Sequence, residues 1–99
     1  MAQRESVLSK RIAAELKKQL GFDLFVFKVW GSAHMMAGLP DLIGCYRGRF
    51  FGLEVKHPET RSNQSERQLL VQGWIRQAVG LSEVVTSPKE AVDALRTLD

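Results

Sequence analysis

One stretch, residues 38–56, constrains the fold of this chain more than any other part of the sequence. Two apolar runs, 42–46 and 50–55, flank a short Arg-Gly-Arg sequence. Apolar runs of this length on either side of a glycine-containing turn predict a β-hairpin. The other elements of the chain are therefore interpreted by how they would surround this hairpin.

Three charged residues interrupt the predicted hairpin, with Asp41 at its start and Glu54 and Lys56 near its end. Side chains two positions apart on a strand share a face, so Glu54 and Lys56 should point the same way. The opposite face, which we expect to be the core side, carries Phe51, Leu53 and Val55. A carboxylate beside an ammonium group, with another carboxylate on the paired strand, is unusual for packing alone and suits a divalent cation.

Carboxylate oxygens are the ligands that Mg²⁺ and Mn²⁺ prefer, and Mg²⁺ is often held by only one or two of them. The Val55 carbonyl would add another oxygen between Glu54 and Lys56. A metal there would acidify a bound water, and Lys56 would orient that water or neutralise developing charge. Taken separately, Pro-Asp is a common turn dipeptide and Glu-x-Lys is often a solvated strand face. Their combination on paired strands favours metal-dependent phosphodiester hydrolysis.

A helix predicted over residues 4–20 should pack on the hairpin. Its apolar stripe consists of Leu8, Ile12, Leu16 and Leu20. On a helical wheel Glu5 lies near the middle of this stripe and Glu15 at its edge, so Glu5 should project inward. The alternative is that Glu5 only favours the positive end of the helix dipole.

The remaining elements follow from period and capping signals. They are a strand at 22–29, a loop at 30–38, a loop at 57–63, a helix from Ser65 to about 79, a strand at 82–86 and a helix from 88 to about 98. Leu69, Trp74, Ile75 and Ala78 should supply the apolar surface of the second helix. In the loop at 30–38, Trp30, Met35 and Met36 are interpreted as packing residues, with a stacking platform as the alternative. The predicted element order is α-β-β-β-α-β-α.

Length and charge set limits on the class of protein. Ninety-nine residues make one domain, 1–99, and the net charge of +3 permits a nucleic-acid partner without proving one. The single cysteine, Cys45, excludes an internal disulfide, fits a reducing cytoplasm and is expected in the core. No apolar run approaches the 18 residues of a membrane span. We therefore expect a cytoplasmic protein of a bacterial or phage-infected cell, with no membrane partner.

The sequence resembles the PD-(D/E)xK nuclease superfamily and, within it, the virus-type replication–repair nuclease (VRR-NUC) domain. The resemblance is carried by residues 38–43, 46–50 and 52–56, and by Ser65-x-x-Gln68 at the start of the next helix. Since the element order is that of the family core, the resemblance covers nearly the whole chain. It implies an α/β fold with a restriction-endonuclease-like core, in which helices flank a mixed central sheet.

The same resemblance implies a DNA endonuclease that depends on Mg²⁺ or Mn²⁺ and needs no organic cofactor. It assigns the metal to Glu5, Asp41, Glu54 and the Val55 carbonyl. Lys56 matches the catalytic lysine, beside the catalytic carboxylates of Asp41 and Glu54. Gln68 matches a supporting glutamine, although its alternative role is the helix cap alone.

The expected DNA contacts are less well defined. The family often has arginines in the loop before Pro-Asp, whereas residues 31–37 contain none. The remaining candidates for binding the DNA backbone are Lys28, Arg47, Arg49, His57 and Arg61. Similar minimal nucleases and the related Holliday-junction resolvases act as homodimers, which predicts a homodimer that cuts branched or four-way DNA. The alternatives are a non-catalytic nucleic-acid-binding protein on this fold and a sequence-specific, restriction-type nuclease.

Overall fold

A computed structural model describes residues 2–31 and 34–99. Within these residues the helices are α1 (Ala2–Leu20), α2 (Glu66–Gln77) and α3 (Pro88–Arg96). The strands are β1 (Leu24–Lys28), β2 (Leu42–Tyr46), β3 (Arg49–Val55) and β4 (Leu81–Val85). The predicted order α-β-β-β-α-β-α is confirmed. None of the described helices is long and apolar enough to cross a membrane.

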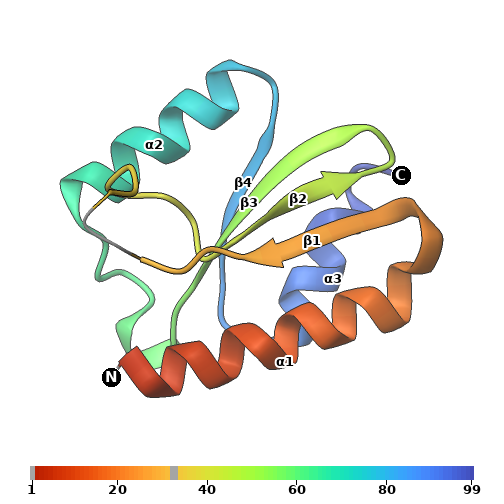
Figure 1. The fold of residues 1–99 in the computed structure, drawn as a ribbon, viewed down its shortest axis with the longest axis horizontal. Coiled ribbons are helices and arrows are strands. Elements are labelled where there is room, and N and C mark those ends of the chain that lie inside the picture. The colour runs from red at the N-terminus through yellow and green to blue at the C-terminus, as the bar shows by residue number, and fades with distance from the viewer. Residues whose placement is uncertain (1, 32–33) are drawn as a thin grey trace.

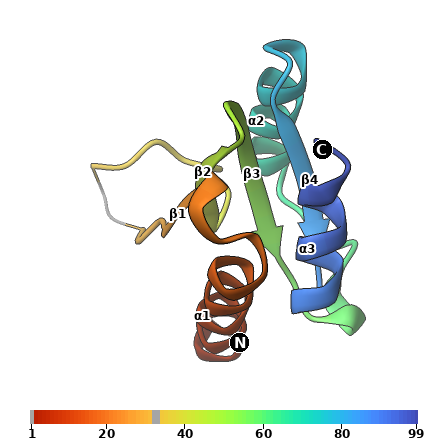
Figure 2. The same ribbon diagram turned by 90° about the vertical axis from the view of Figure 1, so that its right-hand side faces the viewer.

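The four strands form one mixed sheet in the order β1-β2-β3-β4. The pairs β1–β2 and β2–β3 are antiparallel, and β3–β4 is parallel because α2 carries the chain back between them. Helices α1 and α3 pack together on one face of the sheet, while α2 lies on the other side against β3 and β4 (Figures 1 and 2). The sheet is therefore covered completely on one face and only partly on the other.

The hairpin turn between β2 and β3 explains why the two strands meet directly. Both Arg47 and Gly48 have positive φ angles, 51° and 84°. Two central residues with positive φ are the pattern of a type I′ turn, whose twist matches that of antiparallel strands. Strand β3 consequently begins at Arg49, one residue earlier than the sequence indicated.

The core lies between the sheet and the pair α1–α3. The predicted stripe of α1 is buried there, together with the inward residues of the strands and of α3. Its members are Leu8, Ile12, Leu16, Leu20, Val26, Leu42, Tyr46, Phe51, Leu53, Val55, Val85, Ala91, Val92 and Leu95. The core face predicted for β3 is thus confirmed.

Three sequence-based expectations about burial are wrong. Cys45 is exposed, because it lies on the face of β2 that α2 does not reach. Of the residues predicted for the apolar surface of α2, Ile75 is half-buried but Leu69, Trp74 and Ala78 are exposed, and the buried residues of α2 are Val71 and Gln72. In the loop after β1, Trp30, Met35 and Met36 are exposed rather than packed. For Cys45 and Trp74 the cause is that this face of β1 and β2 has no covering helix.

Candidate active site

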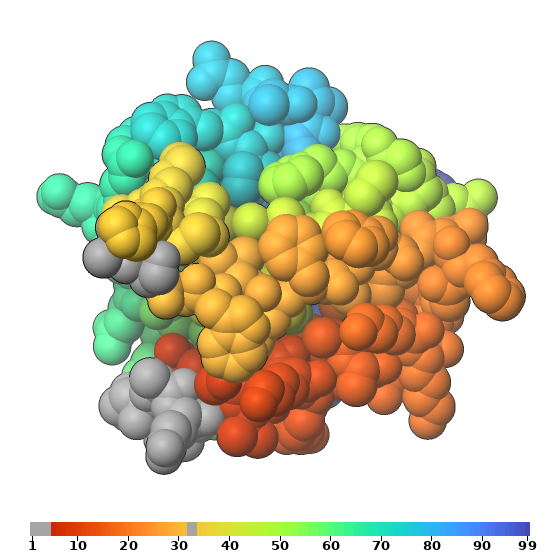
Figure 3. Space-filling view, in the orientation of Figure 1, coloured from red at the N-terminus to blue at the C-terminus, as the bar shows by residue number. Residues whose placement is uncertain are grey.

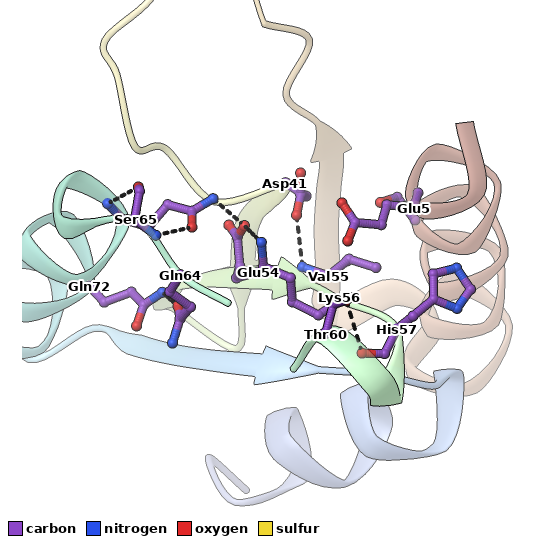
Figure 4. A network of polar contacts seen from close by, with 12 residues as sticks. Glu5, Asp41, Glu54, Val55, Lys56, His57, Thr60, Gln64, Ser65 and Gln72 are labelled. Carbon is purple, nitrogen blue, oxygen red and sulfur yellow. Dashed lines mark hydrogen bonds and ion pairs between the residues drawn. The ribbon is translucent and has the colours of Figure 1, made fainter. Parts of the chain in front are cut away.

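The predicted carboxylates meet at one end of the sheet, where β2 begins and β3 ends. Asp41 immediately precedes β2, while Glu54 and Val55 are the last residues of β3 and Lys56 follows them. Antiparallel pairing of Leu42 with Leu53 brings these chain segments side by side. The beginnings of α1 and α2 flank the same end of the sheet (Figures 1 and 4).

Asp41 is fixed by hydrogen bonds on both its side chain and its backbone. Its Oδ2 accepts a hydrogen bond of 2.7 Å from the Val55 N–H, and its carbonyl accepts one of 2.8 Å from the Val29 N–H. Burial raises the pKa of Asp41 above its ordinary value, while the Val55 N–H and the charge of Lys28 oppose that rise. The carboxylate is therefore held rigidly in a site that disfavours its negative charge.

Glu54 is the most strongly perturbed group of the site. Its side chain is almost fully buried, and its Oε2 accepts a hydrogen bond of 2.6 Å from the Gln68 amide. Burial, and after it the charge of Asp41, raise the pKa of Glu54 from 4.5 to about 8, although Lys56 lowers it. Burial thus disfavours the charged form of Glu54, and the neighbouring Asp41 carboxylate adds to the effect.

Lys56 is the nearest cation to Glu54. Its Nζ lies 3.7 Å from Glu54 Oε2, and its side chain is only 12% exposed. The Lys56 N–H donates to the Val85 carbonyl at 3.0 Å, which ties this residue to the end of β4. The prediction that Glu54 and Lys56 share a face is confirmed.

Gln68 acts both as a capping residue and as a partner of the site. Its backbone N–H donates to Ser65 Oγ at 3.0 Å, and its Oε1 accepts from the Ser65 N–H at 3.0 Å, which is a complete capping box. Its Nε2 remains to donate to Glu54. The two alternatives considered for Gln68 are therefore compatible, because one amide serves both.

Glu5 comes to the site from the first turns of α1. Its carboxylate is directed towards Asp41 and Val55 in Figure 4, and its charge raises the pKa of both Asp41 and Glu54. Glu15 instead accepts a hydrogen bond of 2.7 Å from Gln19, farther along the helix. The choice of Glu5 as the inward glutamate is confirmed.

These groups form an arrangement that suits a divalent cation. No three His, Cys, Asp or Glu side chains form a complete metal cage within the described ranges. Magnesium does not require one, since it keeps several waters and is commonly held by one or two carboxylates and a phosphate. Burial and, after it, the charge of Asp41 disfavour the charged form of Glu54, and a bound cation would oppose both effects. Asp41 and Glu54 therefore fit the predicted metal.

The predicted basic residues do not all lie at the site. Lys28 is beside it, because it pairs with Leu42 and its charge lowers the pKa of Asp41. Arg47 and Arg49 lie at the opposite end of the hairpin, about 17 Å away along the five-residue strand β2. There the Arg47 guanidinium lies 3.9 Å from the Asp23 carboxylate and 4.0 Å from that of Asp99. Arg49 donates a hydrogen bond of 2.8 Å to the Val79 carbonyl.

Two further candidates follow the hairpin. His57 is half-buried directly after Lys56 and is directed towards α1 (Figure 4). Arg61 forms an ion pair of 2.8 Å with Glu90 and also donates to the Val84 carbonyl, so it points towards α3 and β4. A role for either residue in DNA binding stays a prediction.

Trp30, beside the site, was predicted to be a packing residue, with stacking as the alternative. Trp30 follows β1 and is 61% exposed, with the Lys28 Nζ 4.7 Å and the Lys10 Nζ 5.6 Å from its ring centroid. A single tryptophan in a glycine-containing loop gives no sequence signal that separates packing from binding. The signal that could have indicated a binding role for Trp30 was Lys28, two residues earlier, which was already a candidate for binding phosphate.

Comparison with known proteins shows a likeness in structure. No protein-family profile and no curated protein sequence matches the chain. A solved structure described as a VRR_NUC domain is similar over 89% of this chain and 94% of its own, with a TM-score of 0.64 and 24% sequence identity. At this identity the likeness establishes the arrangement of the backbone. The chain therefore has the fold of that VRR_NUC domain, in agreement with the α/β fold that its sequence motifs indicated.

Proposed function

We propose that this protein is a metal-dependent, structure-selective DNA endonuclease that acts on branched or four-way DNA. The observation that carries the proposal is the meeting of Asp41, Glu54 and Lys56 at one end of the sheet, with Glu54 buried at a pKa of about 8. Perturbed carboxylates beside a buried lysine are typical of catalytic sites. The VRR_NUC fold supports a nuclease-type domain in general.

The residues of the site would divide the work as follows. Asp41 and Glu54, with the Val55 carbonyl and Glu5, would hold Mg²⁺ or Mn²⁺. When bound, the ion would acidify water and stabilise charge on the phosphate. Lys56 would orient the attacking water or neutralise the developing negative charge. Gln68, through its 2.6 Å hydrogen bond, keeps the Glu54 carboxylate in a fixed orientation.

The substrate would be recognised by shape and backbone. In the described part of the chain, all three helices pack against the sheet, so none is presented as a reading helix for a DNA groove. Contacts to phosphates position a protein on DNA without reading its sequence. This favours a structure-selective enzyme over a sequence-specific one.

A homodimer would place two such sites on the two strands of the DNA. The uncovered face of the sheet offers a surface through which two copies of the chain would pair. Figure 3 shows the β1 side chains uncovered between α1 and the β2–β3 hairpin. Phe25, Phe27 and Phe50 on this face are 65%, 47% and 46% exposed. Aromatic side chains of this size offer about 300 Å² in total, a substantial part of the roughly 800 Å² that each partner of an ordinary interface buries. We propose that a second copy of the chain covers this face.

The test is cleavage of an end-labelled four-way junction by the purified protein in Mn²⁺, Mg²⁺ or EDTA, with a linear duplex of the same sequence as the comparison. We expect cutting of the junction in either metal and none in EDTA. Binding without cutting in every condition would favour the non-catalytic alternative. Cutting of the linear duplex at fixed sequences would favour the restriction-type alternative.

A further inference from the structure

Trp30 lies at the edge of the candidate active site. The preceding residue, Val29, donates its N–H to the Asp41 carbonyl at 2.8 Å, so the backbone that carries Trp30 is attached to the backbone that carries a site carboxylate. The indole is nevertheless 61% exposed. A tryptophan held beside the site with most of its ring in solvent is not explained by core packing.

Two ammonium groups accompany the ring. Lys28, at the end of β1, lies 4.7 Å from the ring centroid, and Lys10, on α1, lies 5.6 Å from it. The charge of Lys28 also acts on Asp41, so this cation lies close to both the ring and one carboxylate of the site. An exposed aromatic plane flanked by cations matches the two parts of a nucleotide, since bases stack on aromatic rings and phosphates bind ammonium groups.

We propose that Trp30 stacks on an unpaired nucleobase of the DNA strand in the site, while Lys10 and Lys28 bind its neighbouring phosphates. The proposal rests on the proposed nuclease function and names its substrate class: DNA with an unstacked nucleotide next to the bond that is cut. A base within an intact duplex is already stacked on both sides, and taking it out costs free energy. Trp30 would therefore favour branches, bulges and flaps over continuous duplex.

The chain contains a matched control for this tryptophan. Trp74 is 44% exposed and carries Arg67 over its ring at 5.0 Å. It lies on α2, in an apolar groove of about 300 Å³ whose lining includes Ile43 and Phe50. Both tryptophans are therefore exposed with a cation over the ring, but only the Trp30 ring shares its cation, Lys28, with Asp41.

The experiment measures binding in EDTA, where the proposed metal-dependent cutting is absent. Three DNA ligands share one sequence: a duplex, the duplex with one unpaired thymidine, and the duplex with an abasic residue at that position. In a Trp74→Phe background, we expect Trp30 fluorescence to be quenched by the unpaired thymidine and not by the abasic ligand. Stacking of one base predicts about tenfold tighter binding of the unpaired thymidine ligand.

Substitutions then separate the tryptophan from the lysines. Trp30→Leu should remove the tenfold preference, whereas Trp74→Leu should keep it. Lys10→Ala should weaken binding of all three ligands alike and lower the salt dependence by about one ion, as expected for a phosphate contact. Because Trp30 is largely exposed, Trp30→Leu should leave the melting temperature unchanged.

Equal affinity for the unpaired and abasic ligands, loss of the preference equally in Trp30→Leu and Trp74→Leu, or no binding of any ligand would each overturn the proposal. The result is distinct from the test of nuclease activity. A protein that discriminates the unpaired base but cuts no DNA with Mn²⁺ would refute the endonuclease and retain the stacking site. A protein that cuts junctions but does not discriminate the unpaired base would support the endonuclease and refute the stacking site.

Discussion

Replacing Glu54 by Gln should stabilise the metal-free protein at alkaline pH, although it should abolish nuclease activity. Glu54 is 4% exposed, and burial beside Asp41 raises its pKa from 4.5 to about 8. A glutamine of nearly the same shape carries no charge and still offers an oxygen to the Gln68 amide. The substitution therefore removes the cost of burying a carboxylate and keeps the packing.

The direction of the pH effect follows from the raised pKa. Below pH 4.5 the Glu54 carboxyl is protonated in both folded and unfolded chains and makes no difference to stability. Between pH 4.5 and about 8 the unfolded chain loses this proton while the folded chain keeps it, so the free energy of unfolding falls as pH rises. Over this whole interval the free energy of unfolding falls by roughly 5 kcal/mol, and the full loss is reached above pH 8. Asp41, whose pKa is also raised, adds to the fall in the same direction.

We expect the gain in Glu54→Gln at pH 8.5 to be roughly half of that value, because Lys56 loses its nearby carboxylate. The measurement is urea unfolding in EDTA at pH 5, 6.5 and 8.5, with Glu83→Gln, an exposed position on β4, as the control. Wild type should lose stability across this range and Glu54→Gln should lose much less. Added Mn²⁺ should restore the stability of wild type at pH 8.5 and should not change that of Glu54→Gln. A wild-type stability that rises from pH 5 to 8.5, or a glutamine variant no more stable at pH 8.5, would refute the reasoning.

Three further substitutions test the site and the proposed dimer. Lys56→Met should slow junction cutting by about 100-fold or more without lowering DNA affinity, as measured in single-turnover assays; near-normal cutting would remove Lys56 from the mechanism. Glu5→Ala should raise the Mn²⁺ concentration needed for half-maximal cutting by about tenfold, while Glu15→Ala should not; the reverse order would overturn the inward assignment of Glu5. Phe25→Glu should shift the protein to monomers in analytical ultracentrifugation, whereas Phe22→Glu, at a fully exposed position of a turn, should not; identical profiles for both would contradict the proposed interface.

The features predicted correctly from the sequence are those set by local pattern. The Arg47–Gly48 turn fixes the hairpin register, and that register brings Asp41 and Glu54 together. The four-residue step of the α1 stripe fixes the direction of Glu5, because a helix turns by a constant angle per residue. Each of these predictions needs only neighbouring residues, and the structure confirms each.

The features that were missed depend on which surfaces the helices cover. Alternation on β2 places Cys45 opposite the core face, but the sequence does not show that α2 lies against β3 and β4 and leaves β2 bare. Trp74 was assigned to the buried side of α2 for the same reason. The position of Arg47 and Arg49 away from the site is different, since a hairpin turn necessarily lies at the far end from the strand termini that carry Asp41 and Glu54.

The energetics of Glu54 connect the fold to the proposed chemistry. Two buried carboxylates, with the charge of Glu5 added to them, meet Lys56 and Lys28 as nearby cations and Gln68 as a neutral donor. We expect this arrangement to destabilise the metal-free fold at neutral pH, and an amide at position 54 would satisfy the same hydrogen bond without that cost. Packing alone therefore gives no reason for an ionisable group there. A divalent cation does, because it would turn the repulsion between Asp41 and Glu54 into shared attraction to one ion.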